Sequence, residues 1–127
     1  MAINTTGRYY SYSGSLSESG AGQFNNLTTS DWIGIALDME SSTQTIKYYK
    51  NGSTLLLNLD LISNMQGQTV FPFLMNYENR SWDINFGGHT INTISSAASD
   101  ADGYGTFEYA PPSGYYAICT KNLEEYG

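Results

Sequence analysis

Apolar and polar residues alternate along several short segments of this chain, and a period of two is typical of a β-strand rather than of a helix. The alternation is clearest over residues 32–39, WIGIALDM. One face of this segment carries large apolar side chains and the other carries mostly small ones: Ile33, Ile35, Leu37 and Met39 against Trp32, Gly34, Ala36 and Asp38. The small residues predict that another part of the molecule packs closely against that face.

The neighbouring segments predict a hairpin and further strands. Residues 45–50, TIKYYK, follow across the polar turn ESST and are expected to pair back on 32–39. Asn51 and Gly52 are expected to form the next tight turn, since such turns need positive φ and Gly adopts it freely. The other expected strands are 8–13, 69–75, 82–86, 106–110 and 115–120, with Trp82, Ile84 and Phe86 facing the core and Pro72 at an edge or a bulge.

No segment keeps a sustained helical period. The chain has 127 residues, a length that suits one domain with one hydrophobic core. Several short strands separated by turn signals, with no helix, predict an all-β fold that is either an antiparallel β-sandwich or a barrel.

Charge and composition narrow the classes of partner. The chain has 5 Lys and Arg against 12 Asp and Glu, a formal net charge of −7. An acidic domain repels phosphate groups, so neither nucleic acid nor an anionic membrane is expected as a partner. No apolar run approaches the roughly 20 residues that span a bilayer, and MAINTTGRYY has no features of a secretory signal. The single cysteine, Cys119, is expected to be a small buried apolar residue.

Two carboxylates raise the question of catalysis. Asp38 and Glu40 are two residues apart, which on one strand is roughly 6.5–7 Å between Cα atoms, and paired carboxylates at roughly 5–10 Å run glycoside hydrolysis. Glu40, however, already lies in the turn. We therefore favour a structural role for Asp38 as a turn residue, because an Asp side chain at a strand end accepts hydrogen bonds from nearby backbone amides.

The remaining candidate chemistry is sparse. Asp100 and Asp102 form a fragment of a Ca²⁺ loop, but no bidentate Glu follows at the required spacing, and a solvated turn is the favoured interpretation. His89 is the only histidine and has no companion ligand in the sequence. We therefore expect no catalytic residue, no metal site and no cofactor.

Aromatic residues are the better candidates for recognition. A flat ring gives contact area at low entropic cost, and Asn and Arg supply hydrogen bonds beside it. The candidate ligand-binding residues are Tyr9 and Tyr12 in the first strand and Tyr77, Asn79 and Arg80 in the loop NYENRS.

Three blocks of the sequence resemble the SPRY domain, the concanavalin-A-like β-sandwich also found as the second half of B30.2. DWIGIALDMESSTQTIKYYKNG is similar to the family's central hairpin, with Asp38 ending its first strand and Asn51–Gly52 following its second. VFPFLMNYENRSWDINFGG is similar to the next strand pair. GYGTFEYAPPSGYYAICTKNL resembles the closing segment of SPRY-like domains in phage virion proteins.

The resemblance implies an antiparallel SPRY-like β-sandwich over 1–127, with the matched core at 31–123 and an N-terminal strand and loop at 1–30. A complete SPRY domain opens with further strands, so this chain is expected to lack the first of them and to receive them from upstream residues, another subunit or a separate fragment. An unpaired edge is otherwise a liability for a free monomer.

The resemblance also implies a function. We expect a non-enzymatic recognition or structural module in a phage or viral structural protein, located in the virion and binding a protein neighbour or a host-surface glycan through its loops. Two alternatives stay open: a glycan-cleaving enzyme that uses Asp38 and Glu40, and a cytosolic SPRY adaptor that binds peptides.

Overall fold

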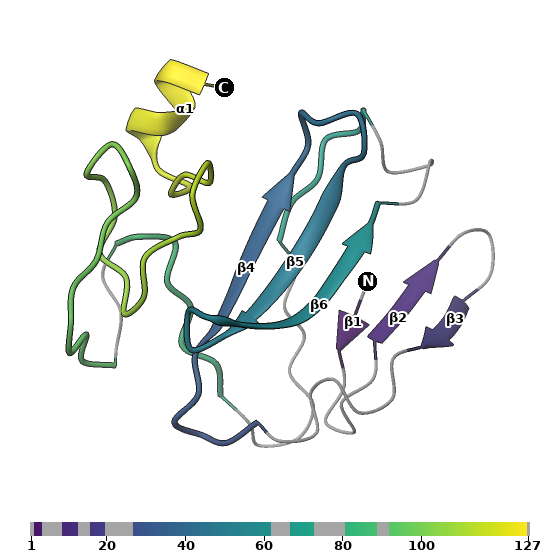
Figure 1. Cartoon of the computed structure of the whole chain (residues 1–127), viewed down its shortest axis with the longest axis horizontal. Coiled ribbons are helices and arrows are strands. Elements are labelled where there is room, and N and C mark those ends of the chain that lie inside the picture. Colours follow the sequence, from purple (N-terminus) through teal and green to yellow (C-terminus); the bar gives the residue numbers. More distant parts are fainter. Residues whose placement is uncertain are drawn as a thin grey trace. The chain divides into compact units, whose positions relative to one another are not determined.

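The computed structural model describes residues 2–3, 9–12, 16–19, 27–61, 67–72, 81–88 and 92–126 (Figure 1). The chain divides into two compact units, Met1–Thr69 and Val70–Gly127.

The first unit holds a three-stranded antiparallel sheet in the order β4-β5-β6, formed by β4 (Ile33–Asp38), β5 (Thr45–Lys50) and β6 (Thr54–Asp60) (Figure 1). The expected hairpin of β4 and β5 is confirmed, with Ile35 opposite Tyr48. No strand was expected over β6, although its leucines alternate. A bulge lies between Tyr48 and Tyr49, which pair with Leu57 and Leu55 respectively. The extra residue turns Leu55 to the opposite face from Leu57.

A second three-stranded antiparallel sheet has the order β1-β2-β3. Its strands are β1 (Ala2–Ile3), β2 (Tyr9–Tyr12) and β3 (Leu16–Ser19). β2 lies within the segment 8–13 that the sequence predicted as a strand. Its pairing with β3 places Tyr9 opposite Ser19 and Tyr12 opposite Leu16.

The hydrophobic core of the β4-β5-β6 sheet lies on the face of Tyr48 and Leu57. Both are buried, and Leu27, Ile33, Ile46, Leu56 and Leu59 pack against them. The same face is open at β4, where Ile35 is 59% exposed and Leu37 is also exposed. On the opposite face Ala36 is buried whereas Gly34 is exposed. The sequence predicted close packing against the face with small residues, and this prediction is confirmed at Ala36 but not at Gly34.

The second unit contains far less regular structure than expected. Strands were expected over residues 82–86, 106–110 and 115–120, and these predictions are wrong. The strand expected over 69–75 is also absent from its described part, residues 69–72. A single bridge between Ala98 and Phe107 is the only β-pairing among its described residues. Side chains take the place of a ladder: Asp83 Oδ2 accepts from Asn92 N at 2.6 Å, and Asn85 Nδ2 donates to the Thr106 carbonyl at 2.7 Å.

The orientation expected for residues 82–86 is also wrong. Trp82 is 60% exposed, and Ile84 and Phe86 are exposed as well, while Asp83 and Asn85 are half-buried. Because the segment is held through its polar side chains, these are the ones that face the rest of the unit. Apolar and polar residues do alternate in this segment, but the apolar side chains face solvent instead of the interior.

The chain also contains a helix where none was expected. Helix α1 (Thr120–Tyr126) is the only helix among the described residues. Leu123 N donates to the Cys119 carbonyl at 2.9 Å, the first helical bond of this turn, and Lys, Leu and Glu in its sequence are good helix formers. No helix in the described ranges is both long and apolar enough to cross a membrane.

Candidate functional site

Most of the residues that the sequence nominated for ligand binding fall outside the part of the chain that the structure describes. This holds for Tyr77, Asn79 and Arg80; His89, for which no site role was expected, also lies outside it. Tyr9 and Tyr12 belong to β2, but their side chains are outside the described features. The site must therefore be built from other residues.

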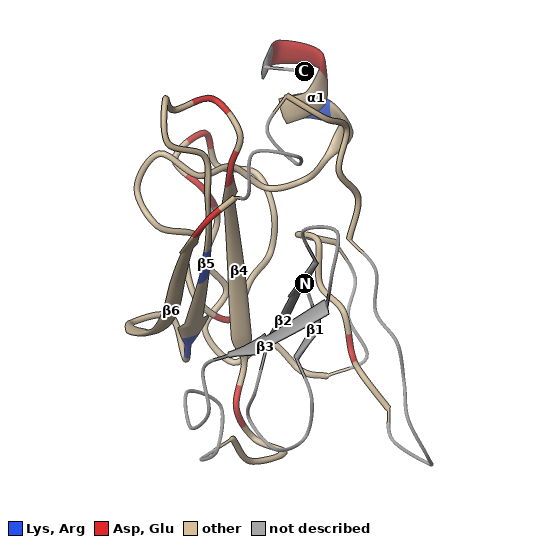
Figure 2. Cartoon of the chain, turned by 90° about the vertical axis from the view of Figure 1, so that its right-hand side faces the viewer, with Lys and Arg blue, Asp and Glu red and all other residues tan. Residues whose placement is uncertain are grey.

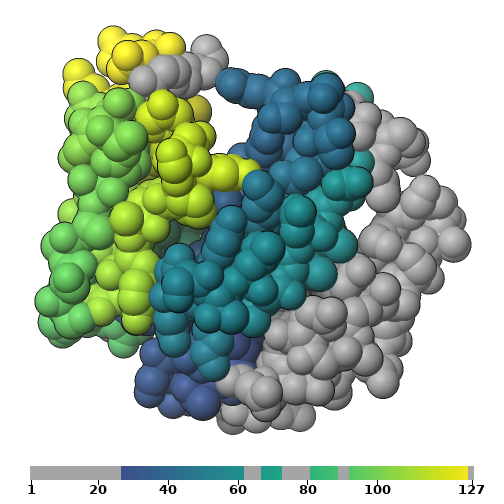
Figure 3. Space-filling view, in the orientation of Figure 1, coloured from purple at the N-terminus to yellow at the C-terminus, as the bar shows by residue number. Residues whose placement is uncertain are grey.

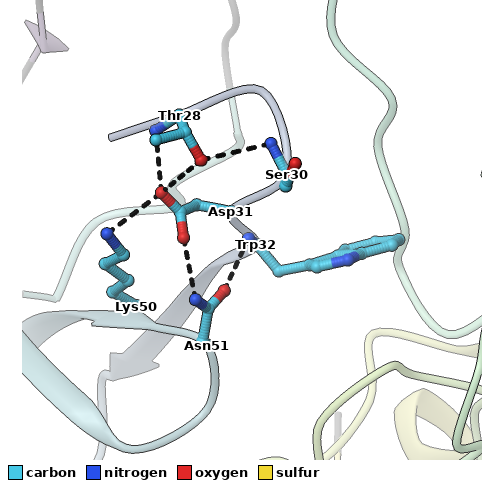
Figure 4. A network of polar contacts seen from close by, with 6 residues as sticks. All are labelled: Thr28, Ser30, Asp31, Trp32, Lys50 and Asn51. Carbon is cyan, nitrogen blue, oxygen red and sulfur yellow. Dashed lines mark hydrogen bonds and ion pairs between the residues drawn. The ribbon is translucent and has the colours of Figure 1, made fainter. Parts of the chain in front are cut away.

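A polar network around Asp31 joins the start of β4 to the turn between β5 and β6 (Figure 4). Asp31 Oδ2 accepts from Thr28 N at 2.7 Å and from Thr28 Oγ1 at 3.0 Å, and it lies 3.0 Å from Lys50 Nζ. Asp31 Oδ1 accepts from Asn51 Nδ2 at 2.8 Å, and Trp32 N donates to Asn51 Oδ1 at 2.9 Å. The Trp32 ring extends away from the network (Figure 4).

The electrostatics of this network favour the ionised carboxylate. The side chain of Asp31 is only 9% exposed. The hydrogen bond from the Thr28 amide, followed by the interactions with Lys50 and Asn51, lowers the pKa of Asp31 far below its ordinary value. A carboxylate held this firmly in its charged form is a structural anchor rather than a proton donor.

Asn51 and Gly52 occupy the turn that the sequence placed there. Asn51 has a φ of 50° and Gly52 a φ of 75°, the positive values that a tight primed hairpin turn needs at its two central residues. The Ser53 amide donates to the Lys50 carbonyl at 3.3 Å and closes the turn. Sequence reasoning missed the role of Asp31. The only signal in the sequence is the TTSD run, in which Thr28 and Asp31 have the spacing of a capping box, whose second side chain reaches back to the amide of the first residue.

Asp38 accepts backbone hydrogen bonds in the turn that follows β4, and Glu40 lies in that turn. Asp38 Oδ1 accepts from Glu40 N at 3.0 Å and from Ser41 N at 2.9 Å. Hydrogen bonds from the Ser41 side chain and amide, with a contribution from the Lys47 charge, lower the pKa of Asp38. The Glu40 side chain is exposed beyond this turn. Asp38 thus shapes the chain at the end of β4.

The loop between β4 and β5 is exposed and yet held at both ends. Its first end is the Asp38 turn, and at its second end Gln44 Nε2 donates to the Met39 carbonyl, while the Leu61 amide donates to the Gln44 carbonyl at 2.7 Å. The residues between, 40–43, are exposed. In Figure 3 this loop lies uncovered at the upper edge of the blue strands. We call residues 39–44 the hairpin loop.

Asp100 is the buried polar centre of the second unit. The turn favoured from the sequence is present, and Asp102 in it is exposed, but Asp100 is only 7% exposed, so the expectation that Asp100 is solvated is wrong. Its Oδ1 accepts from Asp102 N at 3.1 Å and Tyr104 N at 2.8 Å, and its Oδ2 accepts from Ala117 N at 2.9 Å and Asn122 Nδ2 at 2.8 Å. A carboxylate offers about four acceptor positions, so these donors occupy all of them and leave none for a cation.

The same centre fixes helix α1. Asn122 is 5% exposed, and its Nδ2 also donates to the Ala117 carbonyl at 2.9 Å. The pKa of Asp100 is lowered, chiefly by the hydrogen bond from the Ala117 amide. Among the described residues no group of three or more His, Cys, Asp and Glu could hold a metal ion.

The described acidic residues of the first unit lie at the ends of the strands and in the loops, as Figure 2 shows. Lys47 and Lys50 lie on β5, with Lys50 paired to Asp31 at one end of the sheet. The hairpin loop at the other end carries Glu40 and no basic residue. It therefore offers a partner an acidic and hydroxyl-rich surface.

Comparison with known proteins adds the family. The family model of the SPRY domain matches residues 3–89. No curated protein and no solved structure gave a significant match. The closing block, residues 103–123, lies outside the matched range, so the match supports the family and not a phage origin. A SPRY domain implies a β-sandwich, and SPRY domains typically act as protein-interaction modules. Since the match takes in more than half of the 127 residues, the chain belongs to the SPRY domain family.

Proposed function

We propose that this chain is a non-enzymatic protein-interaction module that contacts its partner through the hairpin loop, residues 39–44. The observation that carries the proposal is that this loop is exposed between two hydrogen-bonded ends, the Asp38 turn and the closure by Gln44. The family match agrees with a role in protein binding.

The form of the loop suits recognition. Ordering a flexible side chain at an interface costs about 0.5–1.5 kcal/mol, and a loop held in place beforehand avoids much of the ordering cost. The exposed residues are Glu40, Ser41, Ser42 and Thr43, of which only Glu40 has a long side chain. With a chain net charge of −7, the fitting partner is a protein surface with Lys or Arg side chains and hydrogen-bond donors.

The carboxylates support a role without catalysis. The described carboxyl groups with a shifted pKa are Asp31, Asp38, Asp100 and Glu108, and each pKa is lowered by hydrogen bonds. A general acid at neutral pH would need the opposite shift. The chemistry of these groups is that of turn and loop anchors.

We further propose that the parent protein is a phage or viral structural component, in which the partner is a neighbouring protein of the particle. Support comes from the closing block, residues 103–123, which resembles the end of SPRY-like domains in phage virion proteins. A host-surface glycan is the alternative ligand in that setting. Helix α1 and Asp100 give this block a fixed structure of its own.

A charge reversal on the loop tests the interaction. Particles purified from the source of the sequence are analysed by mass spectrometry for peptides of this chain, and the purified chain is then assayed for binding to each particle protein by biolayer interferometry. Glu40→Lys is expected to weaken binding, while Glu125→Lys, the same change on the exposed side of helix α1, leaves it unchanged. Equal binding by both variants contradicts the loop as the contact. Absence of the chain from the particles contradicts the viral role.

A parallel assay addresses catalysis. The wild-type chain and the Asp38→Asn variant are incubated with bacterial surface polysaccharides, and released reducing ends are measured. We expect no release from either. Release by the wild type that is lost in Asp38→Asn would support a glycan-cleaving enzyme instead.

A further inference from the structure

We propose that Asn51–Gly52 is a self-modification site, at which the Asn side chain deamidates spontaneously when its bond to Asp31 opens. It is the only Asn-Gly step in the chain. In such a step the Gly52 amide nitrogen attacks Asn51 Cγ and forms a cyclic imide, while the side-chain nitrogen leaves as ammonia. Water then opens the ring to give Asp or isoaspartate at position 51. The step needs no reactant other than water.

The local backbone leaves the reaction accessible from the Gly52 side. Gly52 is exposed, has no side chain to hinder attack by its nitrogen, and lies in a tight turn at a φ of 75°. In an unfolded chain nothing would hold the Asn51 side chain, so the reaction would run at the rate of a free Asn-Gly peptide.

The folded protein restrains the other reactant. Asn51 Nδ2, the leaving nitrogen, donates to Asp31 Oδ1 at 2.8 Å, and Asn51 Oδ1 accepts from Trp32 N at 2.9 Å. The Asn51 amide also donates to the Trp32 carbonyl at 2.9 Å. The side chain is therefore bonded at both ends to residues 31 and 32 and is not free to turn toward the Gly52 nitrogen (Figure 4).

The product would not fit the same network. Asp or isoaspartate at position 51 has no side-chain amide hydrogen to donate to Asp31, and it places a second carboxylate beside Asp31, whose ion-pair partner among the described residues is Lys50. Isoaspartate also adds a methylene to the main chain within the turn. Modification would thus keep the start of β4 separated from the β5–β6 turn. The fraction of modified molecules would then increase with the frequency at which the bond between Asp31 and Asn51 opens.

The test measures deamidation in the 127-residue chain. Samples are held in neutral buffer, and isoaspartate at position 51 is quantified by peptide mass spectrometry and isoaspartyl methyltransferase labelling. We expect the folded chain to deamidate at least about tenfold more slowly than the urea-unfolded chain, because the deamidation rate follows the fraction of molecules in which the bond to Asp31 is open. Equal rates in the folded and unfolded chain would overturn the proposal.

Two variants locate the restraint. Asp31→Ala frees Asn51 Nδ2 and is expected to raise the rate in the folded chain severalfold. Lys50→Met removes the ion pair but leaves the Asp31–Asn51 bond, and it should stay close to wild type. An Asp31→Ala variant that is folded by circular dichroism and reacts as slowly as wild type overturns the proposal.

A second measurement covers the case in which Asp31→Ala does not fold. The wild-type rate is followed in urea concentrations below the unfolding transition. A rate that stays above the value given by the globally unfolded fraction, and that barely depends on urea, indicates local opening at Asp31 and supports the proposal, because a local opening exposes little surface. A rate that follows the globally unfolded fraction at every urea concentration overturns it.

Discussion

Asn51 Nδ2 donates to Asp31 Oδ1 at 2.8 Å, and this bond joins residues that are 20 positions apart in the chain. Asp31 precedes β4, and Asn51 begins the turn that leads from β5 to β6. The bond therefore joins the segment that leads into β4 to the turn of the β5–β6 hairpin. It holds the sheet together at the end opposite the hairpin loop.

The side chain and the backbone of Asn51 contribute separately. Asn51→Gly keeps the positive φ but loses the bonds to Asp31 and Trp32, and we expect a loss of about 1–2 kcal/mol in the free energy of unfolding. Asn51→Ala loses the same bonds and adds about 1–2 kcal/mol for a left-handed conformation. Urea denaturation measures both. The prediction fails if Asn51→Ala is as stable as Asn51→Gly.

Gly105 and Gly103 allow the same kind of separation in the second unit. Both have a φ of +83°, but a Cβ at Gly105 would clash with Phe107 Cε2, whereas nothing lies within 4 Å of a Cβ at Gly103. Gly103→Ala should cost about 1–2 kcal/mol, the price of the conformation alone. Gly105→Ala should cost clearly more in thermal denaturation, and Phe107→Leu should recover part of the difference. Equal melting temperatures for the two Ala variants would contradict the clash.

Asn122 should be sensitive to charge. Asn122→Asp replaces the donor to Asp100 Oδ2 with a second carboxylate, so the variant is expected to be strongly destabilised at neutral pH. The deficit relative to wild type should shrink as the pH falls toward the ordinary Asp pKa of 3.8, because protonation removes the repulsion and because the lowered pKa of Asp100 costs the wild type stability there.

Asn122→Ala is the control for that experiment. It removes the hydrogen bonds without adding charge, and should cost about 1–3 kcal/mol with little change in the deficit between pH 7 and pH 5. Denaturant unfolding across the pH series measures all three proteins. A deficit for Asn122→Asp that does not respond to pH would contradict the proximity of the two carboxyl groups.

Tyr48 should make the first unit sensitive to alkali. Burial raises the pKa of Tyr48 from 10.0 to about 12, so the folded state favours the neutral phenol. Its contribution to stability is complete below pH 10 and is lost as the pH rises from 10 through about 12. Fluorescence-detected unfolding should show a steeper decline for wild type than for Tyr48→Phe in this range. Parallel declines would refute the assignment.

Local pattern was enough to predict the centre of the fold. The alternation in residues 32–39 and 45–50 predicted β4 and β5, and Asn51–Gly52 predicted the turn that follows. These are properties of neighbouring residues, since period-two burial and positive φ are set within a few positions. The same reasoning overlooked β6, where a bulge interrupts the alternation of Leu55 and Leu57.

The second unit shows where local pattern misleads. Apolar and polar residues alternate over 82–86 as they do in a β-strand. Trp82 is nevertheless exposed, and the segment is held by hydrogen bonds of Asp83 and Asn85. Alternation marks two faces of a segment, but it does not say which face finds a partner. That depends on the residues that lie beside it in space.

The sequence by itself determined the β4–β5 hairpin and the turn at Asn51–Gly52, and its first two blocks carried the resemblance to the SPRY family that the comparison confirmed. Only the tertiary structure decided what Asp31 and Asp100 do. Asp31 meets Asn51, and Asp100 meets Ala117 and Asn122, across separations of 17 to 22 residues. A local pattern cannot encode such contacts, because each depends on which distant amide the folded chain brings within hydrogen-bond distance of the carboxylate.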